Sequence, residues 1–459
     1  MAEPGRAQPS FGRGATWTMM SQVVIFLTTA AGSIVLGRVL GPGGKGIVSL
    51  VNLVAMVMFL LGSLGIGLSN IYHTGRGRFS IAQLVSNSSL AALMLGPVVF
   101  VLMLAVYPLL SGNVLRHVEL GYLILAGAAV PLTILTSSIY ALLWGQQRFR
   151  LASLLSMIMR SADLALLVVL LVVFKLGVWG AVIAFAVRPV LSVMVYLWAL
   201  GQRPRALIPR YDAPVVRESM GYGLRVQVGQ ILEFSNYRLD MFLVNLFRGK
   251  EAVGLYGTAV AVAEMMWYLP NAIGSVLLAR TAASEETEAD RFTPLICRQA
   301  LLLMVVIAVP LYLAGSALIP VLYGAKFAGA VPPLGLLLPG VVALGLAKVL
   351  STDLAGRGHP EYNSYVLSGA LVISLSLDLL LIPRPGYYGS INGAAISSSV
   401  SYICAAIAML ICFLRVSQAS LAETIIPRRS DWIAYRNLLS SLLGRPTPPT
   451  SLGTEGPAC

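Results

Sequence analysis

Eleven charged residues stand inside long apolar stretches of this sequence, where a charge is costly. The cations are Arg160, Arg188, Arg225, Arg238 and Lys348, and the acids are Asp163, Glu233, Asp240, Glu264, Asp353 and Asp378. A charge at the centre of a membrane helix costs at least about 2.5–3.5 kcal/mol on insertion scales. We therefore expect these side chains to face a wet path or one another rather than lipid.

Two kinds of chemistry suit such residues. Arginine and lysine bind phosphate or carboxylate groups strongly in a cleft of low dielectric. All five cations are therefore candidate substrate-binding residues, and Arg188, Arg225 and Lys348 are expected to hold an anionic head group. Buried acids can instead bind a proton or Na⁺ in exchange for substrate, so the candidate coupling or cavity acids are Asp163, Glu233, Asp240, Glu264 and Asp378.

Local pairing is the structural alternative for some of these charges. Arg160 and Asp163 stand three apart, on one face of a helix, and can neutralise each other. Arg238 and Asp240 lie near one end of their apolar stretch, as does Asp353, and long side chains at such ends can reach the interface. The other six have no partner nearby in sequence and are expected to line a cavity: Arg188, Arg225, Glu233, Glu264, Lys348 and Asp378.

Other sites are not indicated. Gly41–Gly46 satisfies GxGxxG, but it separates two apolar stretches and does not join a strand to a helix. No GxxxxGK[ST] occurs. The three histidines, His73, His117 and His359, fall in three different connections, and the four cysteines form no CxxC pair. We therefore expect no metal site, no cofactor and no enzymatic activity.

The elements that carry the charges are predicted to be membrane helices. Hydrophobic residues make up 57% of the 459 and charged residues only 11%, whereas a soluble domain has about a quarter charged. Apolar stretches long enough to cross a bilayer as helices occur near residues 15–37, 47–71, 81–107, 120–144, 151–174, 178–200, 221–245, 253–278, 296–322, 332–355, 362–382 and 391–414. The expected fold is all-α, with twelve transmembrane helices.

The distribution of basic residues predicts the orientation. Of the 32 lysines and arginines, 19 lie in the N-terminal arm, the even-numbered connections and the C-terminal tail, and 8 lie in the odd-numbered connections. The positive-inside rule then places both termini in the cytoplasm. The net charge of +13 is explained by these connections and does not indicate nucleic-acid binding. In the tail, residues 432–443 have the spacing of an amphipathic helix on the membrane surface.

An internal repeat divides the chain. A shift of 208 residues places Gln22 on Gln230, Gly41 on Gly249, and Gly46 on Gly254. Because six helices separate the repeats, both halves have the same orientation, a known plan for transporters. We predict an N-terminal six-helix lobe, a cytoplasmic linker, a C-terminal six-helix lobe and a cytoplasmic tail with a disordered end, at residues 1–200, 201–220, 221–414 and 415–459.

Several stretches, in order along the chain, resemble the Wzx-like polysaccharide and O-antigen flippases of the MOP superfamily. They are VLGRVLGPGGKGIVSL (35–50), GSLGIGLSNIYHTGRG (62–77), LDMFLVNLFRGKEAVGLYGTA (239–259), LYGAKFAGA (322–330) and LDLLLIPRPGYYGSINGAA (377–395). On this resemblance Asp240 is the family's acid in span seven. Asp378 stands where the family usually has Asn. This difference bears on which substrate charge the site prefers and on its coupling to an ion.

The resemblance implies a MATE-like fold and alternating access. Its implied substrate is a polyprenyl-diphosphate-linked oligosaccharide, flipped to the outer leaflet of a prokaryotic plasma membrane for surface polysaccharide assembly. The implied partners are membrane lipid, a polysaccharide polymerase and glycosyltransferases, with no nucleic acid. Alternatives of the same fold are a flippase for the peptidoglycan lipid precursor and an ion-coupled multidrug antiporter. A membrane glycosyltransferase is a more distant one, since the odd-numbered connections hold only Glu119 and Glu251 as acids.

Overall fold

The computed structural model describes residues 11–283 and 286–426, and nearly all of them are helical. The expected amphipathic helix at 432–443 lies outside the described residues. Ten described helices are long and apolar enough to cross a membrane. The first of them contains two spans, and α7 is a further long helix that carries more charge, so the described residues contain twelve transmembrane helices.

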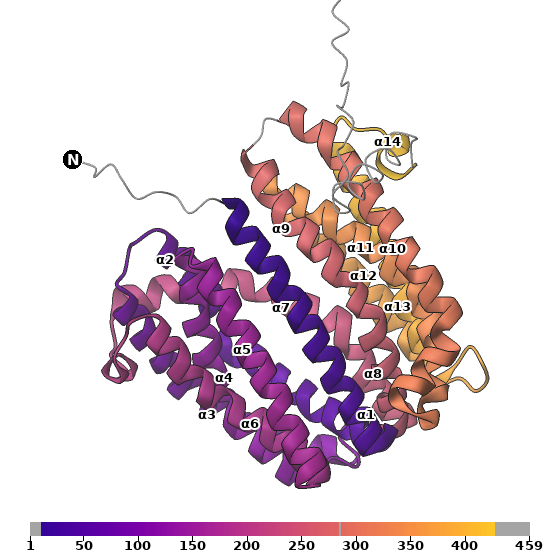
Figure 1. Ribbon diagram of the computed structural model, residues 1–459, viewed down its shortest axis with the longest axis horizontal. Coiled ribbons are helices and arrows are strands. Elements are labelled where there is room, and N and C mark those ends of the chain that lie inside the picture. The colour runs from indigo at the N-terminus through magenta and orange to yellow at the C-terminus, as the bar shows by residue number, and fades with distance from the viewer. Residues whose placement is uncertain (1–10, 284–285, 427–459) are drawn as a thin grey trace, which may run out of the picture.

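The first six spans form the N-terminal lobe, drawn in indigo to magenta in Figure 1. Its elements are α1 (Phe11–Ser63), α2 (Ile66–Gly75), α3 (Ile81–Ser111), α4 (Leu120–Gly145), α5 (Phe149–Val168), the π-helical turn η1 (Val169–Val173) and α6 (Gly177–Ala199). α1 contains spans one and two because Gly41, at φ 66° and ψ −178°, reverses the chain inside it. That conformation suits glycine, which has no Cβ to clash with the backbone.

The C-terminal lobe follows a short 3₁₀ turn, η2 (Pro204–Leu207). Its elements are α7 (Ala213–Arg248), α8 (Lys250–Glu264), η3 (Met265–Trp267), α9 (Tyr268–Ala283), α10 (Glu286–Tyr323), η4 (Ala325–Ala330), α11 (Val331–Gly356), α12 (Glu361–Leu381) and α13 (Ser390–Val416). The 3₁₀ turn η3 joins α8 to α9, and together they make span eight. The short helix α14 (Leu421–Ile425) packs against α10.

The two ends of the molecule differ in how the lobes meet. We call the end that holds Phe11, the α2–α3 connection and α14 the termini side, and the other end the opposite side. In Figure 1 the lobes join at the bottom, on the opposite side, and diverge toward the termini side at the top.

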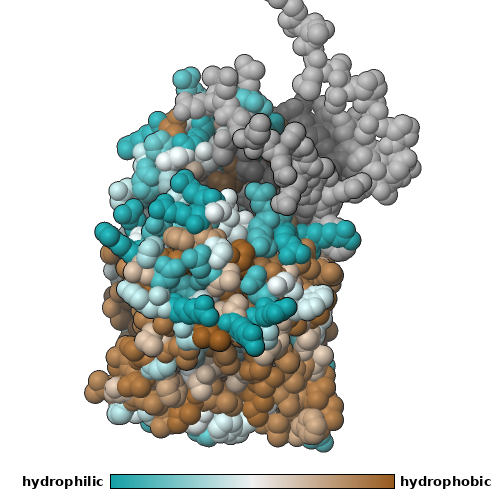
Figure 2. Space-filling view, turned by 90° about the vertical axis from the view of Figure 1, so that its left-hand side faces the viewer, coloured by the Kyte–Doolittle hydropathy of each residue, from teal (hydrophilic) through white to brown (hydrophobic). Residues whose placement is uncertain are grey.

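The surface of the lobes confirms a multi-pass membrane protein. On α3 alone, Leu93, Met94, Val98, Val101 and Leu102 are each more than half exposed. Figure 2 shows hydrophobic residues covering the lower part of one side of the molecule, with hydrophilic residues gathered toward the termini side. Because water does not solvate such a surface favourably, the apolar part is the part that faces lipid.

Candidate functional site: the lobe interface and the intramembrane charges

The two copies of the internal repeat contact each other at the opposite side of the molecule. A Cβ on Gly46 would lie 1.8 Å from the carbonyl oxygen of Lys250, and a Cβ on Gly254 would lie 1.9 Å from that of Pro42. Pro42 and Lys250 are 208 positions apart, as are Gly46 and Gly254. The contact is therefore reciprocal, as expected where a two-fold axis relates two copies of one surface. Only glycine allows the backbones to approach this closely.

Two side-chain contacts flank this centre, and the residues that accept them are related by the repeat. Asn245 of α7 donates through Nδ2 to the Val114 carbonyl of the N-terminal lobe at 2.5 Å. Arg38 of α1 donates through Nε to the Leu322 carbonyl of the C-terminal lobe at 2.7 Å. Val114 and Leu322 are also 208 positions apart. The opposite side is thus closed by one central backbone contact and two side-chain contacts, one on each side.

A buried lysine lies just inside this closure. Lys45 is 5% exposed, and its Nζ donates to Ser33 Oγ at 3.0 Å and to Thr258 Oγ1 at 2.7 Å. The same ammonium lies 4.3 Å from the ring centroid of Tyr323 and 5.6 Å from that of Phe327. Among the described residues it has no carboxylate within ion-pair distance. Lys45 therefore links both lobes through hydroxyl groups and aromatic rings.

The charges of the N-terminal lobe form one small cluster. Asp163 of α5 lies 3.8 Å from Arg188 of α6, each about a quarter to a third exposed. The expected local pair of Arg160 with Asp163 is not the one observed, because Arg188 provides the ion-pair contact. Arg160 is exposed and makes no ion pair with another described residue. Two arginines and one carboxylate leave this cluster with one excess positive charge.

In the C-terminal lobe, two further cations lie beside acids. Arg238 and Glu264 form a bidentate pair, at 2.6 Å and 2.7 Å, between α7 and α8. Lys348 Nζ of α11 lies 4.0 Å from Glu233 of α7, and the Glu264 carboxylate also acts on this ammonium. Arg238 therefore does not extend to the membrane–water interface. Glu264 and Lys348 have partners on other helices, which sequence spacing does not reveal.

Two buried carboxylates make a separate cluster in the same lobe. Asp240, 3% exposed, accepts a hydrogen bond from Tyr256 Oη at 2.5 Å and a longer one, 3.3 Å, from Ser398 Oγ. Asp378, 1% exposed, is near enough to interact with it electrostatically and accepts from Ser374 at 3.4 Å. One oxygen of Asp378 has no partner among the described residues. Asp240 is thus held inside the protein and does not extend to the membrane–water interface.

Asp353 belongs to a network on the termini side. It is fully buried and accepts hydrogen bonds from Thr281 and Thr293, at 2.9 Å and 2.8 Å. Arg357 pairs with it at 2.7 Å and reaches Asp290 at the same distance. The network joins α9, α10 and α11 within one lobe. Asp353 therefore stabilises this lobe and does not extend to the membrane–water interface.

Arg225 of α7 is exposed and makes no ion pair with any residue that the structure describes. Two residues away on either side, Gly223 and Gln227 hold α7 against the N-terminal lobe. Gln227 Nε2 donates to the Leu60 carbonyl at 2.6 Å, and a Cβ on Gly223 would lie 2.3 Å from the Leu64 carbonyl. This seam between α2 and α7 continues to the termini side, where Tyr72 stacks on Tyr222 with ring centroids 4.4 Å apart.

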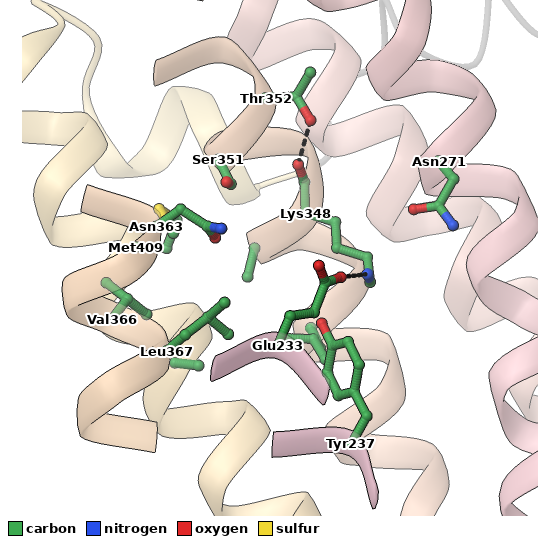
Figure 3. A pocket seen from close by; sticks show the side chains of 13 residues that line it. Glu233, Tyr237, Asn271, Lys348, Ser351, Thr352, Asn363, Val366, Leu367 and Met409 are labelled. Carbon is green, nitrogen blue, oxygen red and sulfur yellow. Dashed lines mark hydrogen bonds and ion pairs between the residues drawn. The ribbon is translucent and has the colours of Figure 1, made fainter. Parts of the chain in front are cut away.

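A cavity of about 170 Å³ lies beside the Lys348–Glu233 pair. Figure 3 shows this pair at one wall, with Tyr237 below it and Asn271 and Asn363 on either side. The lining comes from α7, α9, α11, α12 and α13 and consists of Glu233, Tyr237, Asn271, Leu344, Ala347, Lys348, Ser351, Thr352, Asn363, Val366, Leu367, Ala405 and Met409. Two of the sequence candidates, Lys348 and Glu233, therefore line a cavity.

Comparison with known proteins decides the family. The family model described as "Polysaccharide biosynthesis protein" matches residues 35–332. The chain belongs to this family. An uncharacterized membrane protein of Methanocaldococcus jannaschii is similar as well, at 24% identity over 197 residues, which are 42% of this chain and 38% of that protein. The chain thus matches well under half the length of this relative.

Solved structures of similar fold identify the architecture of the chain. A MATE multidrug resistance transporter of the MOP superfamily, in its inward-facing conformation, matches with a TM-score of 0.72 at 14% identity over 88% of this chain and 98% of that one. The outward-facing conformation of a MATE transporter gives 0.60 at 14% identity, over 88% and 94%. A MOP superfamily transporter from Pyrococcus furiosus gives 0.62 at 15% identity, over 88% and 94%. The expected MATE-like fold is confirmed.

Sequence reasoning missed part of this arrangement. Lys45 lies between the first two apolar stretches and is therefore predicted to belong to a connection, although it is buried between the lobes. The hydroxyl groups of Tyr256, Thr258 and Ser398 were not singled out, because nothing in their spacing marks them. A signal did exist for Lys45, since it lies inside the Gly41–Gly46 stretch that the repeat had identified.

Proposed function

We propose that this protein flips a polyprenyl-diphosphate-linked oligosaccharide from the cytoplasmic to the outer leaflet of the plasma membrane. The observation that carries the proposal is the family match over residues 35–332, which connects the transporter fold to polysaccharide assembly. Glycosyltransferases would supply the lipid-linked unit on the inside, and a polymerase would consume it on the outside. The surplus of basic residues supports cytoplasmic termini, so the termini side would be the inner side.

Alternating access follows from the repeat. Two similar lobes related by an axis along the membrane normal can rock against each other about a central site. The present arrangement, closed at Gly46 and Gly254 and divergent toward the termini side, would be the inward-open state. The closer match to an inward-facing transporter supports this interpretation. Opening to the outside would break the reciprocal glycine contact and rehydrate Lys45.

The cluster of Arg160, Arg188 and Asp163 is our candidate for binding the diphosphate. It has one more cation than acid, and Arg160 is exposed without an ion-pair partner in the described chain. Arginine binds phosphate in a bidentate manner, so a doubly charged diphosphate suits two arginines. Arg225, exposed on α7, and Arg238, paired with Glu264, remain further candidates of the cavity, with Arg238 better suited to positioning Glu264.

Asp240 and Asp378 are our candidates for coupling to an ion. Two carboxylates close together in a buried site hold either a shared proton or a cation between them. The hydroxyl groups of Tyr256, Ser398 and Ser374 supply additional oxygen atoms of the kind that hard cations prefer. The oxygen of Asp378 that has no hydrogen-bond partner among the described residues would be free to bind H⁺ or Na⁺.

The proposal is tested in a strain that lacks the protein. Loss of surface polysaccharide together with internal accumulation of lipid-linked units is expected, and wild-type protein should reverse both. Arg160→Gln and Arg188→Gln should complement poorly, whereas Arg116→Gln, a control at an exposed arginine on the opposite side, should complement fully. Unaltered surface polysaccharide without an internal pool would overturn the proposal.

A multidrug antiporter is the second candidate, since a multidrug resistance transporter is among the structural matches. It predicts that the deletion sensitises cells to cationic dyes and leaves the surface polysaccharide unchanged. Accumulation of peptidoglycan precursor with cell lysis would instead identify the peptidoglycan alternative. The glycosyltransferase alternative predicts that the lipid-linked unit is lost in the deletion strain rather than accumulated.

A further inference from the structure

The cavity of the C-terminal lobe contains a cation whose charge is compensated. Lys348 is paired with Glu233 at 4.0 Å, and Glu264, which itself pairs with Arg238, is a second acid near the same ammonium. Two cations and two acids cancel. An anionic group that entered this cavity would meet Glu233, whose side chain is half exposed, as well as Lys348. The cavity is therefore poorly suited to a diphosphate or to an acidic sugar.

The remaining polar groups of the cavity are uncharged. Asn271, Ser351, Asn363 and the hydroxyl of Tyr237 all line it, and none makes a side-chain hydrogen bond to another described residue. A side-chain amide offers both donors and an acceptor, and a hydroxyl offers a donor and acceptors. These groups can match a ligand that carries neighbouring hydroxyl groups, each of which both donates and accepts.

Aromatic and apolar side chains surround these polar groups. The Tyr237 ring lines the cavity, with its centroid 5.1 Å from Lys348 Nζ, and the buried Trp267 ring lies behind the lining, 5.1 Å from the Tyr237 ring. Val366, Leu367 and Met409 form part of the apolar lining. Aromatic rings beside hydrogen-bonding groups suit a ligand with one apolar face and a polar edge. A sugar ring has this character.

The size of the cavity agrees. Its volume is about 170 Å³, whereas sites that enclose drug-sized ligands have roughly 300–1,000 Å³. Such a space has room for about one sugar ring.

We infer that this cavity is a subsite for one uncharged sugar of the transported glycan, separate from the cations that bind the diphosphate. The inference rests on the proposed function and narrows it, because it assigns the sugar to the C-terminal lobe and the anion to Arg160 and Arg188. Glu233 acts as a specificity residue, since it cancels Lys348 and so disfavours acidic sugars. Discrimination of this kind works by a repulsive element against the wrong ligand.

The test compares short, soluble probes on the purified full-length protein in nanodiscs. The probes are farnesyl diphosphate and farnesyl-diphosphoryl derivatives of glucose, galactose, N-acetylglucosamine and glucuronic acid, with binding measured by isothermal titration. At least one uncharged sugar should strengthen binding about tenfold over farnesyl diphosphate, the gain of one to two good hydrogen-bonding contacts. The glucuronic acid derivative should show no such gain.

Variants separate the two subsites. Asn363→Ala and Asn271→Ala should abolish the sugar-dependent gain and leave farnesyl diphosphate binding unchanged, whereas the control Asn113→Ala, in an exposed connection, should change neither. Arg160→Gln should weaken binding of every probe and keep the ratio between them. A gain that survives both asparagine substitutions would overturn the inference.

A substitution that changes the preferred sugar from uncharged to acidic is the sharper test. Glu233→Gln exposes the Lys348 ammonium, so the glucuronic acid derivative should now bind about tenfold more tightly than to wild type. Adding Lys348→Met should remove this new affinity. Unchanged binding of the acidic probe to Glu233→Gln would contradict the inference. Failure of every probe to bind wild type, farnesyl diphosphate included, would instead count against the proposed function itself.

Discussion

The closed opposite side depends on two glycines, and this dependence leads to a quantitative prediction. A Cβ on Gly46 would lie 1.8 Å from the Lys250 carbonyl oxygen, and real Cβ contacts are essentially never below 3.0 Å. Gly46→Ala therefore requires a separation of at least about 1.2 Å between two backbones at the centre of the lobe contact. Gly254→Ala requires nearly the same on the other side of the axis, because its Cβ would lie 1.9 Å from the Pro42 carbonyl.

The cost follows from overpacking. Inserting a methyl group into a packed contact costs about 1–3 kcal/mol, because neither backbone can yield without moving its helix. The cost applies only while the opposite side is closed, so it shifts the balance between closed and open by about 5–150-fold. Each substitution should therefore raise the population open on the opposite side and lower the transport rate.

Spin labels measure the shift directly. Labels at Asn113 and Tyr387, exposed connections of the two lobes on the opposite side, should report a longer mean distance in Gly46→Ala than in wild type. The four native cysteines are first replaced by alanine. Gly369→Ala is the matched control, because a Cβ there meets nothing within 4 Å. An unchanged distance distribution in Gly46→Ala, with normal melting behaviour, would refute the interpretation of this contact as a gate.

Three further predictions concern buried polar groups. Lys45→Met should raise the melting temperature and slow transport, because the closed side then no longer buries an ammonium that lacks a carboxylate partner. A lower melting temperature in differential scanning calorimetry would contradict this prediction. In wild type, Na⁺ or a lower pH should raise the melting temperature in the same measurement, and Asp378→Asn should abolish this increase, since only one buried carboxylate would remain at the site. An increase equal to that of wild type would show that Asp378 is not part of an ion site. His73, outside the spans and packed among Tyr72, Phe79 and Tyr222, has its pKa lowered by burial, with Glu218 opposing and Arg78 and Arg76 reinforcing the shift. The contact between α2 and α7 should therefore be fully stable above the ordinary histidine pKa of about 6.5 and weaken as the pH falls below it, and His73→Phe should remove this dependence in hydrogen exchange of α2; a contact that strengthens on acidification would show that the sign is wrong.

Much of the fold could be predicted from the sequence because lipid imposes strong rules. Long apolar stretches must be helices in a membrane, so the number of spans followed from composition and length. The repeat was visible at glycines, since Gly41 and Gly249 share an unusual extended conformation with positive φ, at 66° and 81°. Glycines that permit a close backbone approach leave the clearest trace in sequence.

The partners of the charged residues could be predicted much less well. Spacing rules apply within one helix, so they suggested Arg160 with Asp163, whereas the ion pair observed joins Asp163 to Arg188 on the next helix. Arg238 and Glu264 are 26 residues apart and meet only because α7 and α8 pack together. Lys45 shows a further limit, because a lysine in a glycine-rich stretch is typical of a connection, and only packing against α8 and α10 buries it.

The proposal of lipid-linked glycan transport is tested most directly by reconstitution. The purified protein in liposomes is supplied with a fluorescent polyprenyl-diphosphate-linked oligosaccharide, and the fraction that becomes accessible to a membrane-impermeant quencher or lectin is followed with time. We predict rapid loss of leaflet asymmetry with wild type, strong slowing with Arg160→Gln, and no effect of Arg116→Gln. Wild-type liposomes no faster than protein-free liposomes, under an imposed Na⁺ or proton gradient as well as without one, would contradict the account.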